Sequence, residues 1–217
     1  MVNIQADKAT ALKIASDLLS IEAIKLNVEN PFTWSSGWKS PIYCDNRMSL
    51  SYPETRTFIK QKLAEAAKTH FPDYEAVAGV ATAGIPQGAL LADLLEVPFI
   101  YVRSKPKGHG MENLIEGKVD PGKKVLVVED LVSTGGSSLK AAEALKSAGY
   151  EVLGMLAIFT YGFPLADENF DKAGIPLCCL SNYTVMLEKA IEMGYISSED
   201  LNSLEEWRNA PSLWRQS

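Results

Sequence analysis

The sequence lacks the charge pattern of a nucleic-acid-binding protein and the apolar runs of a membrane protein. Its 21 Lys and Arg residues are outnumbered by 27 Asp and Glu residues, which gives a formal net charge of −6. The sequence has no run rich in Lys and Arg. Phosphate backbones are bound through clustered cations, so nucleic acid is not the expected partner. Residues 1–26 lack a signal-peptide pattern, and no stretch is apolar over a bilayer's width. We therefore expect a cytoplasmic protein without membrane contact.

Cysteine is scarce as well. The chain has three, Cys44, Cys178 and Cys179, and cysteines adjacent in sequence cannot bond to each other without strain. We expect reduced, buried thiols.

The length and composition favour one folded domain. A chain of 217 residues, 47% hydrophobic and 22% charged, supports one sizeable core but not two comfortable domains. We expect a single domain over residues 1–217, with a core at roughly 70–180, an N-terminal segment at 1–50 and a helical tail at 184–217.

The N-terminal third predicts two helices. Residues 9–24 carry apolar side chains at helical spacing. Ser51 stands three residues before Glu54, with Pro53 in the first turn, which predicts a capped helix that continues to about residue 68.

From Glu75 onward, short apolar runs alternate with helical stretches. The predicted strands are residues 76–81, 99–102, 124–128, 152–159 and 176–180. The predicted helices are residues 86–95, 137–148, 163–172, 185–192 and 199–207. This alternation indicates an α/β fold with a mostly parallel sheet flanked by helices. Ligands collect at the carboxyl ends of such strands, which draws attention to the loops after Val80, Val102 and Val128.

The most specific motif is VLVVEDLVSTGGSS at residues 125–138, a buried strand that leads into two acids, a small hydroxyl and glycine loop, and a helix. Residues 134–138 lack bulky side chains, so backbone N–H groups can close around an anion at the helix N-terminus. The helix macrodipole adds about 1 kcal/mol to such binding. A phosphate group fits there.

The acids Glu129 and Asp130 would repel that phosphate unless a cation or hydroxyl groups lie between them. A ribose with vicinal hydroxyls, bound to Mg²⁺, meets this condition. The chain has neither the G-x-x-x-x-G-K-[ST] run of nucleoside triphosphate sites nor a G-x-G-x-x-G dinucleotide turn. The motif favours one monophosphate on a sugar over a glycine turn with solvated acids.

Two further loops follow strands on the same side. Residues 81–88 (ATAGIPQG) either bind a second phosphate through backbone donors or form an ordinary helix entry. Residues 103–113 gather basic side chains on a backbone that glycines interrupt. These side chains are Arg103, Lys105, Lys107 and His109. The position after a strand end favours a loop that closes over an anion rather than a solvated basic loop.

Together, the acid pair with its phosphate loop, the glycine loop and the basic loop resemble the type I phosphoribosyltransferases, and among these the orotate enzymes. The resemblance covers nearly the whole chain, including FTWSSGWKSPIY at residues 32–43, which is similar to the family's base-covering hood. It implies a central, mostly parallel sheet with a small N-terminal hood. It also implies transfer of 5-phosphoribosyl from 5-phosphoribosyl 1-diphosphate (PRPP) to orotate, which yields orotidine 5′-monophosphate and diphosphate for UMP synthesis.

The resemblance implies a role for each matching residue. Glu129 and Asp130 would contact the ribose hydroxyls, and the loop after them would hold the 5′-phosphate. The implied PRPP-binding residues of this motif are Glu129, Asp130, Leu131, Val132, Ser133, Thr134, Gly135, Gly136 and Ser137. Ser133 would also face orotate, together with Lys39 and Tyr43. Family members that use hypoxanthine or guanine usually have Asp at the position of Ser133.

Arg103, Lys107 and His109 match the family's loop that binds diphosphate and acts in catalysis. In the family this loop reaches into the other subunit's active site, so the resemblance implies a homodimer. Mg²⁺ would bind mainly through the PRPP diphosphate and ribose hydroxyls, without a metal site made by protein residues.

The chain departs from the family's pattern at a few positions. Ser104 follows the loop arginine where many members have a second lysine, and Lys105 comes next. Ser35 replaces a hood lysine, and the arginine expected after the strand ending near Phe159 has no counterpart. Three other functions stay open: a phosphoribosyltransferase for another base, a regulator that senses the sugar diphosphate, and a structural module.

Overall fold

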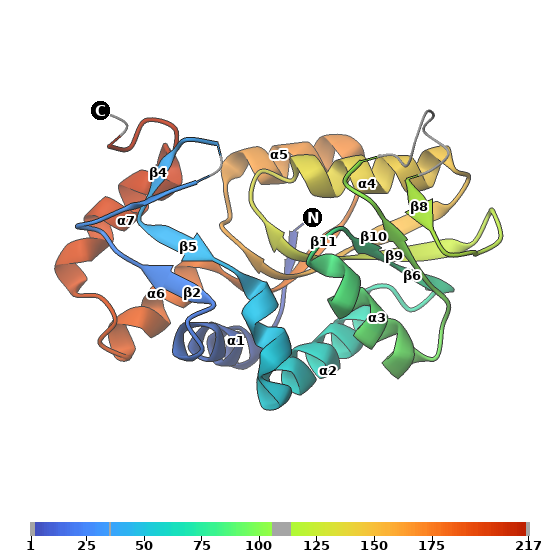
Figure 1. The fold of residues 1–217 in the computed structure, drawn as a ribbon, viewed down its shortest axis with the longest axis horizontal. Coiled ribbons are helices and arrows are strands. Elements are labelled where there is room, and N and C mark those ends of the chain that lie inside the picture. The colour runs from blue at the N-terminus through green and yellow to red at the C-terminus, as the bar shows by residue number, and fades with distance from the viewer. Residues whose placement is uncertain (1–2, 35, 106–113, 216–217) are drawn as a thin grey trace.

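The computed structural model describes residues 3–34, 36–105 and 114–215, and its centre is a seven-stranded sheet (Figure 1). The strand order is β1-β11-β10-β9-β6-β7-β8, and every neighbouring pair is parallel except β7 with β8. The strands are β1 Asn3–Gln5, β6 Ala76–Val80, β7 Phe99–Val102, β8 Ile115–Glu116, β9 Lys124–Val132, β10 Glu151–Thr160 and β11 Leu177–Asn182. The predicted mostly parallel α/β fold is confirmed.

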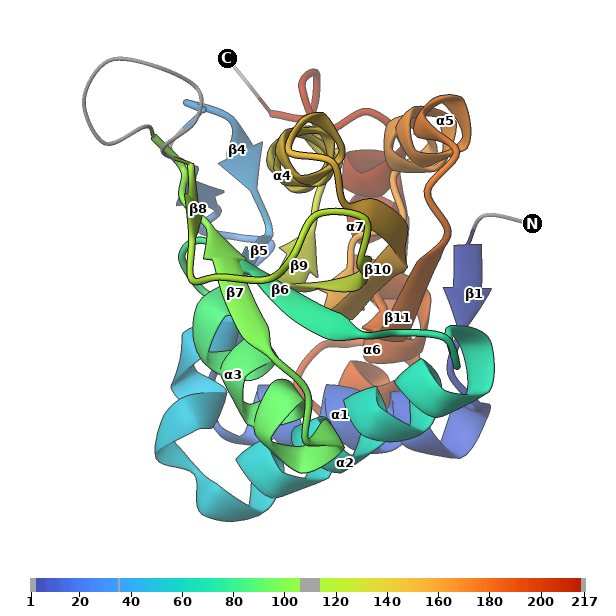
Figure 2. The same cartoon turned by 90° about the vertical axis from the view of Figure 1, so that its right-hand side faces the viewer.

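Helices cover both faces of the sheet (Figure 2). On one face lie α1 Lys8–Ser20, α2 Pro53–His70, α3 Gly84–Leu95 and α6 Tyr183–Glu192, and on the other lie α4 Gly136–Ser147 and α5 Pro164–Ala173. The central strand β9 is buried by helices on both faces. Val125 and Val127 pack on the side of α4 and α5, whereas Leu126 and Val128 pack on the side of α1, α2, α3 and α6. Successive strand residues point to opposite faces, so a strand buried on both sides is apolar at every position.

Residues 24–44, which we call the hood, form two small antiparallel sheets. The first pairs β2 Ile24–Leu26 with β5 Ile42–Cys44, and the second pairs β3 Phe32–Thr33 with β4 Lys39–Ser40. The ring of Trp34 packs 5.3 Å from that of Tyr161, which follows the carboxyl end of β10. The hood therefore lies over the edge of the sheet where ligands are expected.

Several predicted boundaries are wrong. The first helix ends at Ser20, because the chain turns there and enters β2. The predicted Ser51 cap is also wrong, since Ser51 ends the 3-10 helix Asn46–Ser51 and Tyr52 precedes Pro53 without a side-chain hydrogen bond. The tail helix starts later than predicted: Ser197 caps the short 3-10 helix Ser198–Asp200, and α7 runs over Leu201–Asn209.

The strand that carries the acid pair is longer than predicted. It continues past Val128 to Val132, because β10 pairs with it as far as Thr160 opposite Val132. Glu129 and Asp130 therefore belong to a central strand, which fixes their backbone more firmly than a loop would. In the described ranges, no helix is long and apolar enough to cross a membrane.

Candidate active site

The acid pair lies near the carboxyl end of β9. Glu129 is 6% exposed, and its carboxylate accepts hydrogen bonds from the Ser138 hydroxyl and the Asp130 N–H, both at 3.0 Å. Burial, and then the charge of Asp130, raise the pKa of Glu129 well above its ordinary range. Burial also raises the pKa of Asp130. Two neighbouring acids with raised pKa values favour a ligand that brings hydroxyl groups or a cation to them.

The turn after β9 is shaped by glycine. Gly135 has φ +79° and is the N-cap of α4, and a Cβ atom there would lie 2.8 Å from the ring of Phe170. At Gly136 the nearest atom to an added Cβ is Thr134 Oγ1 at 3.8 Å, so the start of α4 is open. The Asn169 amide donates to the Thr134 carbonyl at 3.0 Å and holds the turn. The exposed N–H groups of α4 can therefore receive a phosphate.

The loop after β6 packs directly against the acid-bearing strand. It contains a cis peptide bond between Ala81 and Thr82. A Cβ atom at Gly84 would overlap the Val128 carbonyl oxygen and lie 3.2 Å from the Glu129 Cα. This close approach places Thr82 beside the acid pair, and both line a cavity of about 300 Å³. The cavity is lined by Cys44, Asp45, Arg47, Ala81, Thr82, Ala83, Glu129, Asp130, Leu131 and Ser137.

The approach at Gly84 predicts a stability change. Gly84→Ala should lower the free energy of unfolding by about 1–3 kcal/mol, because β9 is held between β6 and β10 and cannot retreat. Urea unfolding would measure it. Gly136→Ala is the matched control and should stay within about 0.5 kcal/mol of the parent. Equal stability of the Gly84 variant and the parent would show that the two backbones separate freely.

A second cavity, of about 520 Å³, lies under the hood. It is lined by Thr33, Trp34, Ser36, Tyr43, Cys44, Leu131, Ser133 and Tyr161. Cys44 and Leu131 also line the cavity at the acid pair, so the two spaces adjoin. Two of the predicted orotate contacts, Ser133 and Tyr43, therefore lie in one cavity. The third, Lys39, is not among the lining residues and donates through Nζ to Thr33 Oγ1 at 3.0 Å.

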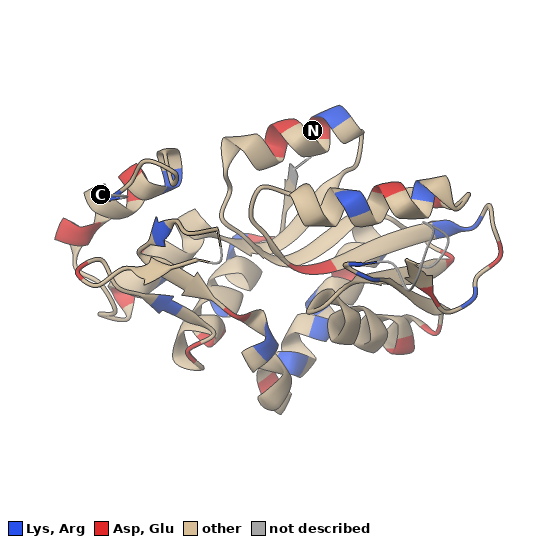
Figure 3. Ribbon diagram, turned by 45° about the horizontal axis from the view of Figure 1, so that its top comes forward, with Lys and Arg blue, Asp and Glu red and all other residues tan. Residues whose placement is uncertain are grey.

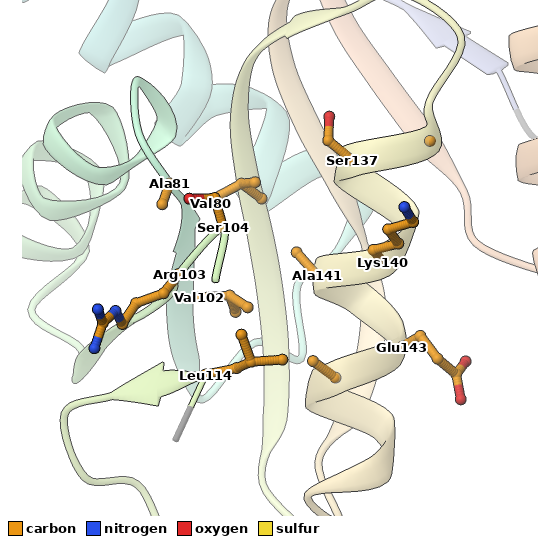
Figure 4. A pocket seen from close by; sticks show the side chains of 12 residues that line it. Val80, Ala81, Val102, Arg103, Ser104, Leu114, Ser137, Lys140, Ala141 and Glu143 are labelled. Carbon is orange, nitrogen blue, oxygen red and sulfur yellow. The ribbon is translucent and has the colours of Figure 1, made fainter. Parts of the chain in front are cut away.

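A third cavity, of about 640 Å³, separates β7 and the residues after it from α4 (Figure 4). Figure 4 shows Arg103 across this space from Ser137 and Lys140. The Arg103 guanidinium pairs with Glu116 at 3.2 Å. Arg103 and Ser137, both predicted to bind PRPP, thus line one cavity. Lys107 and His109 lie outside the described residues, as does Ser35.

Sequence reasoning missed some residues of these cavities. Lys140 lies three positions after Ser137, a spacing that places both on one helix face, so the helix prediction was signal enough to find it. Arg47 lines the cavity at the acid pair, where its guanidinium pairs with Asp45 at 2.6 Å. Tyr161 lines the cavity under the hood. No motif surrounds Arg47 or Tyr161, and only tertiary packing brings them to the site.

Basic and acidic residues of the described ranges are mixed over the protein and do not form a large patch of one sign in the view of Figure 3. Figure 3 shows Lys and Arg interspersed with Asp and Glu along the helices and loops. Among the described residues, no group of three or more His, Cys, Asp or Glu side chains is placed to hold a metal ion. The nearby acids Glu129 and Asp130 suit a Mg²⁺ ion whose oxygen ligands come mainly with the substrate.

Comparisons with known proteins identify the family that shares this sequence. The family model for the phosphoribosyl transferase domain matches residues 50–173. An orotate phosphoribosyltransferase of Porphyromonas gingivalis is 58% identical over 93% of this chain and 96% of its own length. One of Streptococcus pneumoniae is 53% identical over 95% of this chain and 98% of its own.

Solved structures give the same result. Orotate phosphoribosyltransferase from Aeropyrum pernix superposes with a TM-score of 0.74 at 33% identity, over 85% of this chain and 99% of that one. Leishmania donovani UMP synthase superposes with a TM-score of 0.77 at 26% identity, over 92% of this chain but 43% of that longer one. The chain belongs to the phosphoribosyltransferase family, alongside the orotate phosphoribosyltransferases that it matches along almost its whole length.

Proposed function

We propose that this chain is an orotate phosphoribosyltransferase, which transfers 5-phosphoribosyl from PRPP to orotate and releases diphosphate. The product, orotidine 5′-monophosphate, is the precursor of UMP. One observation carries the proposal: the acid pair and glycine turn at the end of β9 lie between a cavity under the hood and a cavity beside Arg103. Relatives 53–58% identical carry the same function in their names.

The donor would lie along the end of β9. Glu129 and Asp130 would accept hydrogen bonds from the ribose hydroxyls, and the backbone N–H groups of residues 134–137 would bind the 5′-phosphate. Leu131 and Val132 have apolar side chains that offer no hydrogen bond to PRPP, so their part would be to place the backbone. The open space at Gly136 and the positive φ of Gly135 support the phosphate position.

Mg²⁺ would be held by PRPP oxygens near Glu129 and Asp130, and it would supply positive charge to the diphosphate as that group leaves. Arg103, Lys107 and His109 would bind the diphosphate and neutralise the charge that develops on it. As the bond from C1 to diphosphate lengthens toward an oxocarbenium-like state, the orotate nitrogen would attack from the opposite face. Arg103 on the cavity wall supports this placement.

The acceptor would lie under the hood, on the other side of the ribose. Ser133 and Tyr43 line that cavity and would contact orotate. Lys39 would act at the cavity's edge, because its ammonium bonds to Thr33, which lines the same space. Trp34 and Tyr161 pack against each other and give this cavity an aromatic wall, against which a planar ring would lie.

The same proposal covers the organisation of the enzyme. We propose one domain over residues 1–217, supported by a core cluster that joins Ile14, the hood's Ile42 and Trp207 of α7. We also propose a homodimer that shares the basic loop between subunits. Cys44, Cys178 and Cys179 are free thiols, the last two buried, which supports a reducing cytoplasm.

Ser133 gives a prediction about the acceptor. Ser133→Asp should raise the KM for orotate at least about tenfold, because two carboxylates would then meet in one cavity. The KM for PRPP should change less than about threefold. Ser133→Ala is the size control and should show a small effect on both constants. Steady-state kinetics with each substrate varied would measure this, and an unchanged KM for orotate in the Asp variant would remove Ser133 from the acceptor site.

The proposed function itself is tested by acceptor specificity. Diphosphate release from PRPP is measured with Mg²⁺ and, in turn, orotate, uracil, adenine and hypoxanthine. We expect release with orotate and near-background release with the other three. Preference for another base would overturn the assignment to orotate while leaving the chemistry in place. Release with none of them would favour the sensor or structural function.

A further inference from the structure

Tyr161 follows the strand after which the family's arginine has no counterpart, and neither the motifs nor the sequence comparisons assign this tyrosine a role. It follows the carboxyl end of β10, and its N–H donates to the Val132 carbonyl on β9 at 3.2 Å. Thr160 is paired with Val132, so Tyr161 lies next to Ser133 across the two strand ends. Only 2% of Tyr161 is exposed, and the residue lines the cavity under the hood. Its small accessible part therefore belongs to that cavity.

Aromatic neighbours hold the Tyr161 ring in place. The rings of Trp34 and Phe163 lie 5.3 and 5.5 Å from it with interplanar angles of 32° and 29°. Phe159 and Trp207 contact it edge-on, at 5.9 and 5.6 Å. Trp207 is fully buried and comes from α7, so the C-terminal helix supports the wall of this cavity. A ring packed on this many sides presents its hydroxyl in one fixed direction.

The Tyr161 hydroxyl differs from other tyrosine hydroxyls of the protein. Those of Tyr150, Tyr183 and Tyr195 donate to backbone carbonyls at 2.9, 3.1 and 2.9 Å. Within the described part of the chain, the Tyr161 hydroxyl makes no such bond. Buried tyrosine hydroxyls normally have a partner, because leaving one without a hydrogen bond costs about 1–3 kcal/mol. A hydroxyl kept at a cavity wall without a protein partner is suited to bind a ligand.

The surroundings keep this hydroxyl protonated. Burial raises the pKa of Tyr161 well above its ordinary value, and the nearby Cys44 and Asp130 act in the same direction. At neutral pH the group is therefore a hydrogen-bond donor, which can bind a carbonyl or carboxylate oxygen.

We propose that the Tyr161 hydroxyl donates a hydrogen bond to an oxygen of the acceptor base, and so contributes to base specificity. The inference rests on the proposed function, since it names a residue of the same acceptor site. A buried donor selects for ligands that carry the matching acceptor, because any other ligand leaves the donor without a partner. The partner here is a planar heterocycle with an oxygen at its edge.

Tyr161→Phe tests the inference, because it removes the hydroxyl and keeps the ring. We expect the KM for orotate to rise about tenfold or more, which corresponds to a bond to a charged oxygen, and the KM for PRPP to stay within about twofold. Tyr183→Phe is the matched control, since it also removes a hydroxyl beside Trp207 but does not line the cavity. The control should leave both constants within about twofold. An orotate KM in Tyr161→Phe equal to that of the control would overturn the inference.

The test separates this inference from the proposed function. If the parent enzyme transfers to orotate and Tyr161→Phe keeps the parent's KM, the inference alone fails. If the parent uses another base, the proposed function fails, and the KM for that base in Tyr161→Phe then decides the role of Tyr161. Should the variant fold poorly, a crystal structure of the parent with orotate replaces it. A ligand oxygen within hydrogen-bond distance of the Tyr161 hydroxyl supports the inference, and an apolar contact there refutes it.

Discussion

Glu129→Gln should lower kcat/KM for PRPP about 100-fold or more and, at the same time, raise the melting temperature at neutral pH. Glutamine keeps an oxygen to accept from the Ser138 hydroxyl, which now bonds to Glu129 at 3.0 Å, so the local structure should persist. The activity falls because a neutral amide binds the ribose hydroxyls and their Mg²⁺ far less well than a carboxylate does. The substitution removes a buried negative charge. Its loss stabilises the protein without ligand, and the same loss weakens the binding of PRPP.

The pH dependence of that stability has a definite sign. Burial and Asp130 raise the pKa of Glu129, so the folded protein holds a proton that the unfolded chain has released. Such a group destabilises the fold increasingly as pH rises from the unfolded value, roughly 4.3, to the raised folded value. The variant should therefore melt higher than the parent at about pH 7.5, and the difference should shrink toward about pH 4. Each kcal/mol corresponds to roughly 2–4 °C at this length.

Thermal melting over that pH range, with kinetics at its upper end, measures both effects. Glu151→Gln is the control, because Glu151 is an exposed residue at the opposite end of β10. The Glu151 variant should have the activity of the parent and the same dependence of melting temperature on pH. Full activity in Glu129→Gln would show that this carboxylate does not bind the donor.

Lys107→Ala should reduce kcat about 100- to 1000-fold while the dissociation constant for PRPP changes less than about threefold. A cation that meets charge developing on the departing diphosphate acts mainly in the transition state, where removing one such donor has effects of this size. The residue lies outside the described ranges, so the prediction depends on the basic loop's sequence and on Arg103 at the loop's start.

Single-turnover kinetics and equilibrium binding of PRPP separate the two quantities. Lys172→Ala on α5 provides the control, since Lys172 is exposed and pairs with Glu168 at 3.6 Å. Turnover near that of the control would take Lys107 out of the mechanism. A large loss of PRPP affinity with unchanged kcat would assign it to ground-state binding instead.

The central motif was predictable because it is local. Apolar residues at 125–128 form a buried strand, and Gly135 after them allows a turn that a larger residue could not adopt. Boundaries were predicted less well. The strand continues to Val132 because β10 pairs with it, and β1 forms only because Asn3–Gln5 pairs with β11. Neither pairing leaves a periodic signal in the sequence.

The residues of the candidate site also divide into those that local sequence predicts and those that only tertiary packing reveals. Ser133 and Tyr43 come from separate segments and line one cavity, although their roles stay predictions. Tyr161 was missed because it follows a strand without any loop motif. Its proposed role rests on its packing with Trp34, Phe163 and Trp207, which tertiary structure brings together.

The account depends on where the donor binds, and a crystal structure with PRPP and Mg²⁺ tests that most directly. We predict the 5′-phosphate at the N-terminus of α4, held by backbone N–H groups of residues 134–137, with the ribose hydroxyls at Glu129 and Asp130. PRPP bound elsewhere by an active enzyme, with this turn empty, would contradict the account.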